Sequence, residues 1–160
     1  MKYEQLNHGD FDAIVTGELT HYALWLEDAI NGIICEYFIG SSEREDDFRR
    51  LILYRDGLTF RDKLEIVHAL IPVFGKTAER CNLKSLLNRI EEFKSWRNSL
   101  AHGWDRSDPD EPRKIVIEVV GHSGKEKRVE ITPASHCEMM EQTAKLLEEV
   151  SEARRQLREF

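Results

Sequence analysis

Residues 82–104 read NLKSLLNRIEEFKSWRNSLAHGW, and this stretch carries the clearest structural signal in the chain. Its apolar side chains recur at Leu83, Leu86, Leu87, Ile90, Phe93, Leu100 and Ala101. A period of 3.6 residues places these side chains on one face of an amphipathic helix. We therefore predict a helix from about Asn82 that packs into a core and is closed by Gly103, a residue type that readily supplies a left-handed conformation.

Arg97 interrupts the apolar face of this helix. At 100° per residue it falls within about 60° of both Phe93 and Leu100, on the face where a structural helix would carry leucine. An uncompensated charge at such a position is costly, so we expect Arg97 to meet an acidic partner, a subunit cleft or a bound anion. The ordinary structural alternative is an arginine that extends past the core or pairs with a carboxylate from another helix.

Asn98 and His102 turn Arg97 into part of a polar cluster. They are four residues apart, so they share one edge of the helix face, although a histidine at a helix C-terminus is also favoured by the helix dipole alone. An imidazole can transfer protons near neutral pH, and a guanidinium binds phosphate oxygens in pairs. The candidate catalytic residues are therefore Arg97, Asn98 and His102, and the candidate substrate-binding residues are Lys94, Trp104 and Arg106.

The run RNSLAHGW at 97–104 resembles the Arg-x4-6-His signature of HEPN domains, in which a polar residue characteristically follows the arginine. The segment LTFRDKLE at 58–65 and the strand pair after the motif are also similar to HEPN members. The resemblance implies a helical homodimer and places Arg97, Asn98 and His102 at the active site. Many members are metal-independent endoribonucleases of toxin–antitoxin or anti-phage systems, whereas others bind nucleotides or are inactive. Trp104 stands where one subgroup carries a tyrosine that accepts a nucleotidyl group, so that modification is not expected here.

RNA cleavage by its own 2′-hydroxyl needs a base, an acid and stabilisation of charge on phosphorus. His102 can serve as base or acid, and Arg97 can stabilise the charge. Because this cluster holds one histidine, a two-fold dimer joined along the helix would bring a second copy. The leading hypothesis is a homodimeric endoribonuclease that needs no metal or other cofactor, acts on RNA, and has an antitoxin protein as a candidate partner.

Two alternatives stay open. The first is a non-catalytic module that binds a nucleotide, RNA or a protein partner through the same residues. The second is a helical dimerisation domain in which Arg97 is only an ion-pair partner at the interface. The net charge of −7 opposes general nucleic-acid binding, because non-specific affinity depends on cations that neutralise phosphates. Residues 80–106 instead hold a local excess of three positive charges, from Arg80, Lys84, Arg89, Lys94, Arg97 and Arg106 against Glu91, Glu92 and Asp105.

The chain has 160 residues, of which 41% are hydrophobic and 33% charged, a composition typical of a single domain spanning residues 1–160. Its three cysteines lack the spacing of a metal site, so we expect reduced thiols and no bound metal. It has no apolar stretch of eighteen or more residues, and its N-terminus is polar. We therefore expect no membrane span and a cytoplasmic location.

The rest of the chain predicts a mainly α fold, an up-and-down bundle of about five helices with a β-hairpin inserted before the last helix. The hairpin pairs residues 114–120 with 127–132 through the linker at 121–124. The other helices are expected at 10–39, from a Ser42-x-x-Glu45 capping box to about Tyr54, from a Thr59 cap to about Leu70 before Pro72, and from Thr132 or Ser135 to the end of the chain.

Overall fold

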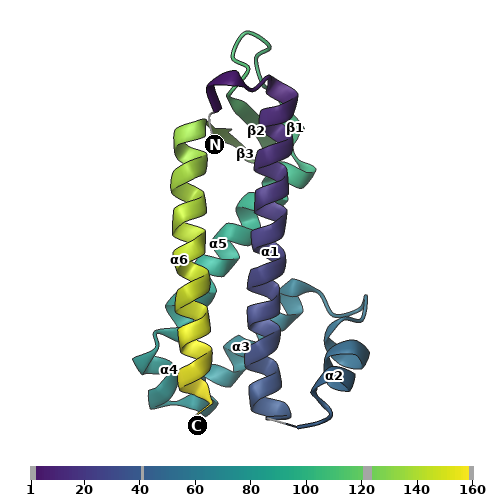
Figure 1. Ribbon diagram of the computed structural model, residues 1–160, viewed down its shortest axis with the longest axis vertical. Helices are drawn as coiled ribbons and strands as arrows, with labels where there is room; N and C mark the ends of the chain where they lie inside the picture. The colour runs from purple at the N-terminus through teal and green to yellow at the C-terminus, as the bar shows by residue number, and fades with distance from the viewer. Residues whose placement is uncertain (1–2, 41, 121–123, 159–160) are drawn as a thin grey trace. The chain divides into compact units, whose positions relative to one another are not determined.

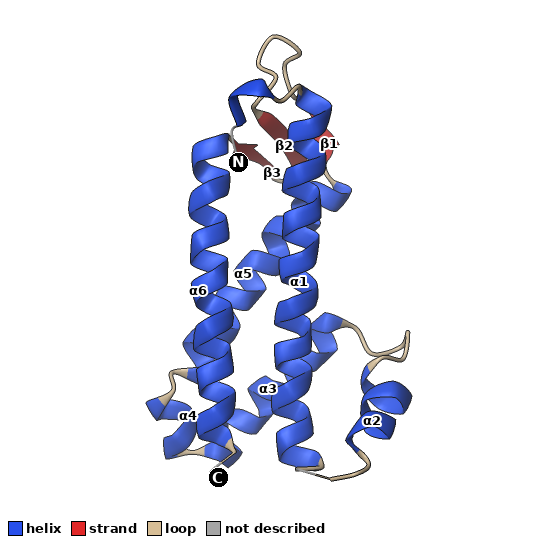
Figure 2. Ribbon diagram, in the orientation of Figure 1, coloured by secondary structure: helices blue, strands red, loops and turns tan. Residues whose placement is uncertain are grey.

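A computed structural model of the chain describes residues 3–40, 42–120 and 124–158. The described residues form six α-helices and three strands, in the order α1 His8–Phe38, α2 Glu45–Phe48, α3 Phe60–Phe74, α4 Lys76–Arg80, α5 Leu83–His102, β1 Trp104–Asp105, β2 Ile115–Val120, β3 Glu126–Ile131 and α6 Pro133–Leu157 (Figure 1). A 3-10 turn at Tyr3–Gln5 precedes α1, and a π-helical turn at Arg49–Leu53 follows α2. Helices dominate, and the strands form one small group between α5 and α6 (Figure 2). The prediction of a mainly helical fold with a β-hairpin before the last helix is confirmed.

The chain divides into two compact units. The sheet unit comprises the described residues of Met1–Ala23 and Glu92–Ala144, and the helical unit those of Leu24–Glu91 and Lys145–Phe160. The helices α1, α5 and α6 each contribute residues to both units. All six candidate site residues belong to the sheet unit.

The sheet unit contains an antiparallel sheet in the order β1-β2-β3. The predicted hairpin pairs Ile115 with Ile131 at one end and Val120 with Glu126 at the other. Residues 121–123 of its predicted linker at 121–124 lie outside the described residues. The short strand β1 is an addition to the prediction, because two residues are too few for a periodic signal. The buried core of this unit includes Phe11, Val15, Leu19, Ile115, Ile117, Val129 and Ile131.

The helical unit buries the predicted apolar faces of its long helices. On α5 the side chains of Leu83, Leu87 and Ile90 are all within 1% of full burial. They belong to a core shared with Leu26, Ile30, Ile33, Leu64, Val67, Leu146 and Val150. The buried ammonium of Lys63 is paired with Glu27. None of the helices within the described residues is both long and apolar enough to cross a membrane.

Two predicted helix boundaries are wrong, the start of α2 and the end of α3. The hydroxyl of Ser42 accepts a hydrogen bond from the backbone N–H of Arg44 at 3.2 Å, which closes a turn and leaves no capping box. The helix α3 begins as predicted, with a reciprocal capping box between Thr59 and Asp62. It then continues past Pro72 to Phe74. A proline so close to the helix end removes one of the last helical hydrogen bonds, and the loss is small enough for the apolar face to be completed.

The start of α6 involves both residues that the sequence offers as alternative helix starts, Thr132 and Ser135. The backbone N–H of Thr132 donates to the hydroxyl of Ser135 at 2.9 Å, and the N–H of Ser135 lies 3.3 Å from the Thr132 hydroxyl. Pro133 then occupies the first helical position, where its missing N–H costs nothing. Thr132 and Ser135 are therefore two parts of one cap.

Candidate functional site

The candidate site lies where α5 ends and β1 begins, and Gly103 forms this junction. A Cβ atom on Gly103 would lie 2.1 Å from Cγ2 of Ile117 and 2.6 Å from the carbonyl oxygen of Ser99. Gly103 does not adopt a positive φ, so the prediction that it closes the helix in the left-handed conformation is wrong. Glycine is required there because β2 approaches the end of α5 too closely for any side chain.

This approach of β2 also changes which face of α5 is buried. The predicted face holds as far as Phe93, which is 6% exposed. Beyond it Leu100 is only half-buried and Ala101 is exposed, whereas Ser99 is buried and donates its hydroxyl hydrogen bond to the Ser95 carbonyl at 2.9 Å. The prediction for Leu100 and Ala101 is therefore wrong, because the strand next to Gly103 covers a different side of the last turn.

Arg97 is half-buried and contacts its neighbour in the sequence. Its guanidinium Nη1 donates a hydrogen bond to the amide oxygen of Asn98 at 3.1 Å. Among the side chains that the structure describes, no carboxylate lies within ion-pair distance of this guanidinium. The sequence predicts that the charge of Arg97 meets an acidic partner, a subunit cleft or a bound anion. The described residues supply no acidic partner, so the other two explanations stay open.

His102 is the last residue of α5, and its side chain is exposed. It follows Asn98 by one helical turn, as expected from the sequence. Its imidazole forms no hydrogen bond with any other residue that the structure describes. Lys94 is half-buried one turn before Asn98 on the same helix. The structure thus joins Arg97 to Asn98 by a direct contact, and it leaves the imidazole of His102 open to solvent.

Trp104 and Arg106 form an exposed aromatic and cationic surface beside the end of α5, which we call the Trp104–Arg106 platform. Trp104 is 69% exposed, and the guanidinium carbon of Arg106 lies 5.0 Å from its ring centroid. Glu118 pairs with Trp104 across β1 and β2, and its carboxylate lies 3.4 Å from Nε of Arg106. This stacked pair can hold a planar group on the free side of the indole ring.

A second histidine, His8, reaches the same region and was missed by sequence reasoning. Its Nε2 lies 3.9 Å from Oδ2 of Asp105, and its buried Nδ1 has no hydrogen-bond partner among the described residues. Hydrogen bonds from Ser107 lower the pKa of Asp105, and the neighbouring His8 lowers it further. Asp105 is therefore a carboxylate at neutral pH. Since His8 lies at the opposite end of the sequence from the motif, no local spacing could have connected them.

Comparison with known proteins supplies no relative for this arrangement. No family model, no curated protein and no solved structure matches the chain. The similarity to HEPN domains therefore rests on the run at 97–104 and on the helical architecture, and membership of that family stays a prediction.

Proposed function

We propose that this protein is a metal-independent endoribonuclease of the HEPN type. The observation that carries the proposal is the state of Arg97. Its half-buried guanidinium is bonded to the Asn98 amide and has no carboxylate partner among the described residues. A positive charge held in this way is suited to an anionic ligand, and a guanidinium matches two oxygens of a phosphate.

The proposed reaction uses Arg97 and two histidines. The 2′-oxygen attacks phosphorus as one imidazole takes its proton, and the bond to the 5′-oxygen breaks as the other imidazole supplies a proton. The products are a 2′,3′-cyclic phosphate and a 5′-hydroxyl. Arg97 stabilises the charge on the phosphate oxygens, and Asn98 fixes the Arg97 guanidinium. His102 and His8 are the proposed proton-transfer groups, with Asp105 orienting His8.

The Trp104–Arg106 platform provides a place for a base beside the reacting phosphate. Stacking of a base on an aromatic side chain contributes about 1–3 kcal/mol and needs no particular sequence. The base must not already be stacked on its neighbours in a duplex, so the proposal favours unpaired RNA as the substrate. Lys94 adds a positive charge one turn from Asn98 on α5.

A non-catalytic binding module is the second candidate function. The observation in its favour is that His102 has no hydrogen-bond partner in the described residues, so nothing in that part of the chain orients its imidazole. Such a module would bind RNA, a nucleotide or a protein partner such as an antitoxin through Arg97 and the platform. It would show binding without turnover.

Cleavage of a mixed structured RNA by the purified protein in EDTA distinguishes these functions. We expect products with 2′,3′-cyclic phosphate ends, and a loss of at least about a hundredfold in rate for Arg97→Ala and for His102→Ala. Arg128→Ala and His21→Ala are the matched controls, because both residues are exposed and belong to the sheet unit. Each variant is checked for helix content and oligomeric state. RNA binding without cleavage by the wild type would favour the binding module.

A further inference from the structure

A cavity of about 650 Å³ opens in the helical unit, apart from the residues of the candidate site. Trp25 and Ala29 of α1 line it on one side. The facing side carries three arginines of α6, Arg154, Arg155 and Arg158. Three guanidiniums line this cavity although the net charge of the chain is −7, so the groups that compensate them decide what the cavity can bind.

Two of these arginines share a single carboxylate. Arg154 donates from Nε and Nη2 to Oε1 of Glu36 at 3.1 and 2.8 Å. Arg158 donates from Nε to the same oxygen at 2.7 Å. Burial of Glu36 opposes its ionisation, but these hydrogen bonds prevail and lower its pKa. Two positive charges therefore face one negative charge, and most N–H groups of both guanidiniums remain available.

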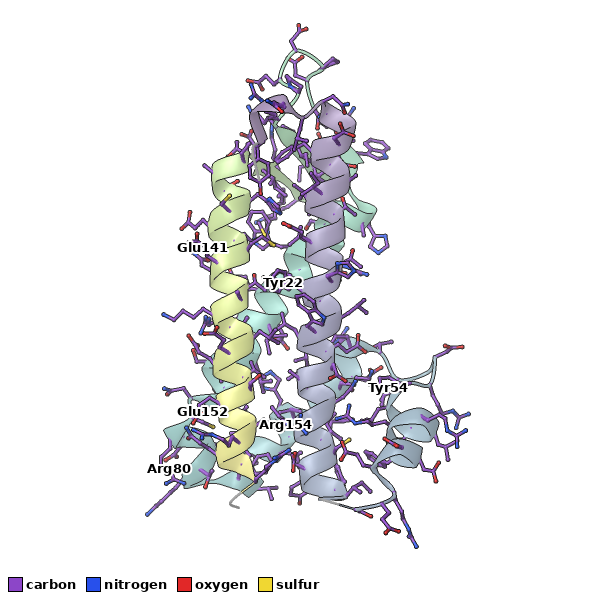
Figure 3. The ribbon with its side chains drawn as sticks, in the orientation of Figure 1. Tyr22, Tyr54, Arg80, Glu141, Glu152 and Arg154 are labelled. Atoms are coloured by element: carbon purple, nitrogen blue, oxygen red, sulfur yellow. The ribbon has the colours of Figure 1, made fainter. Side chains whose placement is uncertain are left out.

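Gly32 fixes the position of the Arg154 side chain. A Cβ atom on Gly32 would lie 2.7 Å from Cζ and from Nη1 of Arg154, so the guanidinium rests directly against the glycine backbone of α1. Figure 3 shows the side chain of Arg154 reaching from α6 toward α1. A glycine within a helix lowers helix stability, and here it makes room for a charged group.

The other polar groups of the cavity leave the positive excess in place. Arg155 is paired with Glu152 at 2.7 Å. Asp28, the acidic residue of the lining, lies 3.0 Å from the guanidinium of Arg49 and accepts a hydrogen bond from Tyr54, so its charge is already compensated. The α6 dipole also favours cations near its C-terminus, but that effect alone does not require a guanidinium held over a glycine.

Apolar groups lie beside these charges. Trp25 is 52% exposed, and Ala29 and Leu147 extend the apolar lining next to it. An exposed indole beside arginines accommodates a planar ring that carries an anionic group. We propose that this cavity binds a small organic phosphate, with the phosphate on Arg154 and Arg158 and a planar ring against Trp25.

Phenyl phosphate is the probe for the first test, titrated into the full chain while tryptophan fluorescence is followed. We expect a saturable change that is absent in Trp25→Phe. Arg158→Gln should weaken binding at least about tenfold, because one of the two guanidiniums that bind the phosphate is lost. Arg158→Lys restores the positive charge and should recover part of the lost affinity. Arg50→Gln, at an exposed arginine of the same unit, is the matched control and should bind as the wild type does.

Several results would overturn the proposal. They are no saturable change in the wild type, binding by Arg158→Gln equal to that of the wild type, and phenol bound as tightly as phenyl phosphate. Inorganic phosphate bound as tightly as phenyl phosphate would overturn the role of Trp25.

Gly32→Ala offers an independent check, since it should displace Arg154 and weaken binding while Arg158 is unchanged. Vesicles containing phosphatidic acid test a lipid headgroup as the source of the phosphate, and Arg158-dependent sedimentation with them would overturn a soluble ligand.

Discussion

The charge of His136 is constrained by its surroundings. It is fully buried, and its Nδ1 lies 3.0 Å from the hydroxyl of Tyr3. Its Nε2 lies 3.2 Å from a carboxylate oxygen of Glu18 but lacks the geometry of a hydrogen bond. Burial lowers the pKa of His136, although Glu18 acts against it. Tyr3, whose pKa is raised to about 12 by burial and by its contact with Cys137, stays neutral near physiological pH.

This lowered pKa predicts a loss of stability in mild acid. The folded chain holds His136 neutral, whereas the unfolded chain protonates it at about pH 6.5, so the unfolded state binds more protons. The free energy of unfolding should therefore fall as the pH drops below about 6.5 and level off below the folded pKa. Urea denaturation at several pH values measures this slope. His136→Gln should flatten it, and His21→Gln, at an exposed histidine, should not. An unchanged slope in His136→Gln would contradict the assignment.

The sequence identified the residue types of the candidate site but not their partners. Arg97 follows from its place within the apolar face of α5, and Asn98 and His102 follow from helical spacing, because residues four apart lie on the same side of a helix. The absence of a carboxylate at Arg97 within the described residues, and the arrival of His8 at Asp105, depend on contacts between segments far apart in the chain. Local helical spacing does not contain that information, since many tertiary arrangements satisfy the same helical pattern.

At the scale of elements, sequence patterns predicted well whether a segment is a helix or a strand, and less well where each helix begins and ends. The helical periodicity of α5 and the β-branched residues of β2 and β3 are strong signals, and all three elements are confirmed. Errors occur where another element intervenes. The buried face of α5 changes after Phe93 because β2 approaches at Gly103, which lies one turn from the buried Ser99 on the same side of the helix. The helix α3 passes Pro72 because its apolar residues continue to Phe74, which is 3% exposed.

The junction between α5 and β1 makes Gly103 a sensitive position. In Gly103→Ala the new methyl group would collide with Ile117 and with the Ser99 carbonyl, neither of which can withdraw without moving β2 or α5. We expect a loss of about 1–3 kcal/mol in the free energy of unfolding, measured by chemical denaturation. Gly17→Ala is the matched control in the same unit. Nothing lies within 4 Å of its Cβ position, so this helical substitution should stabilise by up to about 1 kcal/mol. Equal effects of the two substitutions would contradict the proposed close approach.

At the scale of the whole molecule, the negative charge restricts how RNA can bind. A net charge of −7 gives little long-range attraction for a polyanion. Of the three proposed cationic contacts, Lys94, Arg97 and Arg106, the last is partly neutralised by Glu118. Affinity in the proposed enzyme must then come from stacking on Trp104 and from one well-held phosphate. This favours a defined single-stranded target over non-specific coating of RNA.

The structure also changes what a dimer must supply. From the sequence alone, a second protomer was needed to bring a second histidine to the site. His8 lies beside Asp105, and the proposed mechanism therefore takes both proton-transfer groups, His8 and His102, from a single chain. If the protein is the predicted homodimer, each protomer then carries its own site. The homodimer would still bury helix faces, but catalysis would not depend on residues crossing the interface.

Mixed dimers test whether the site belongs to one chain. We expect that Arg97→Ala and His102→Ala protomers, co-expressed with different tags and purified as the mixed dimer, cleave no more RNA than either variant alone. Each chain would lack one residue of its own site, and its partner could not replace it. A dimer of wild type with His102→Ala is the control, and it should retain about half of the activity if the two sites are independent. Recovery of activity in the doubly mutant pair would mean that Arg97 of one protomer works with His102 of the other, and the site would then be shared between the two chains.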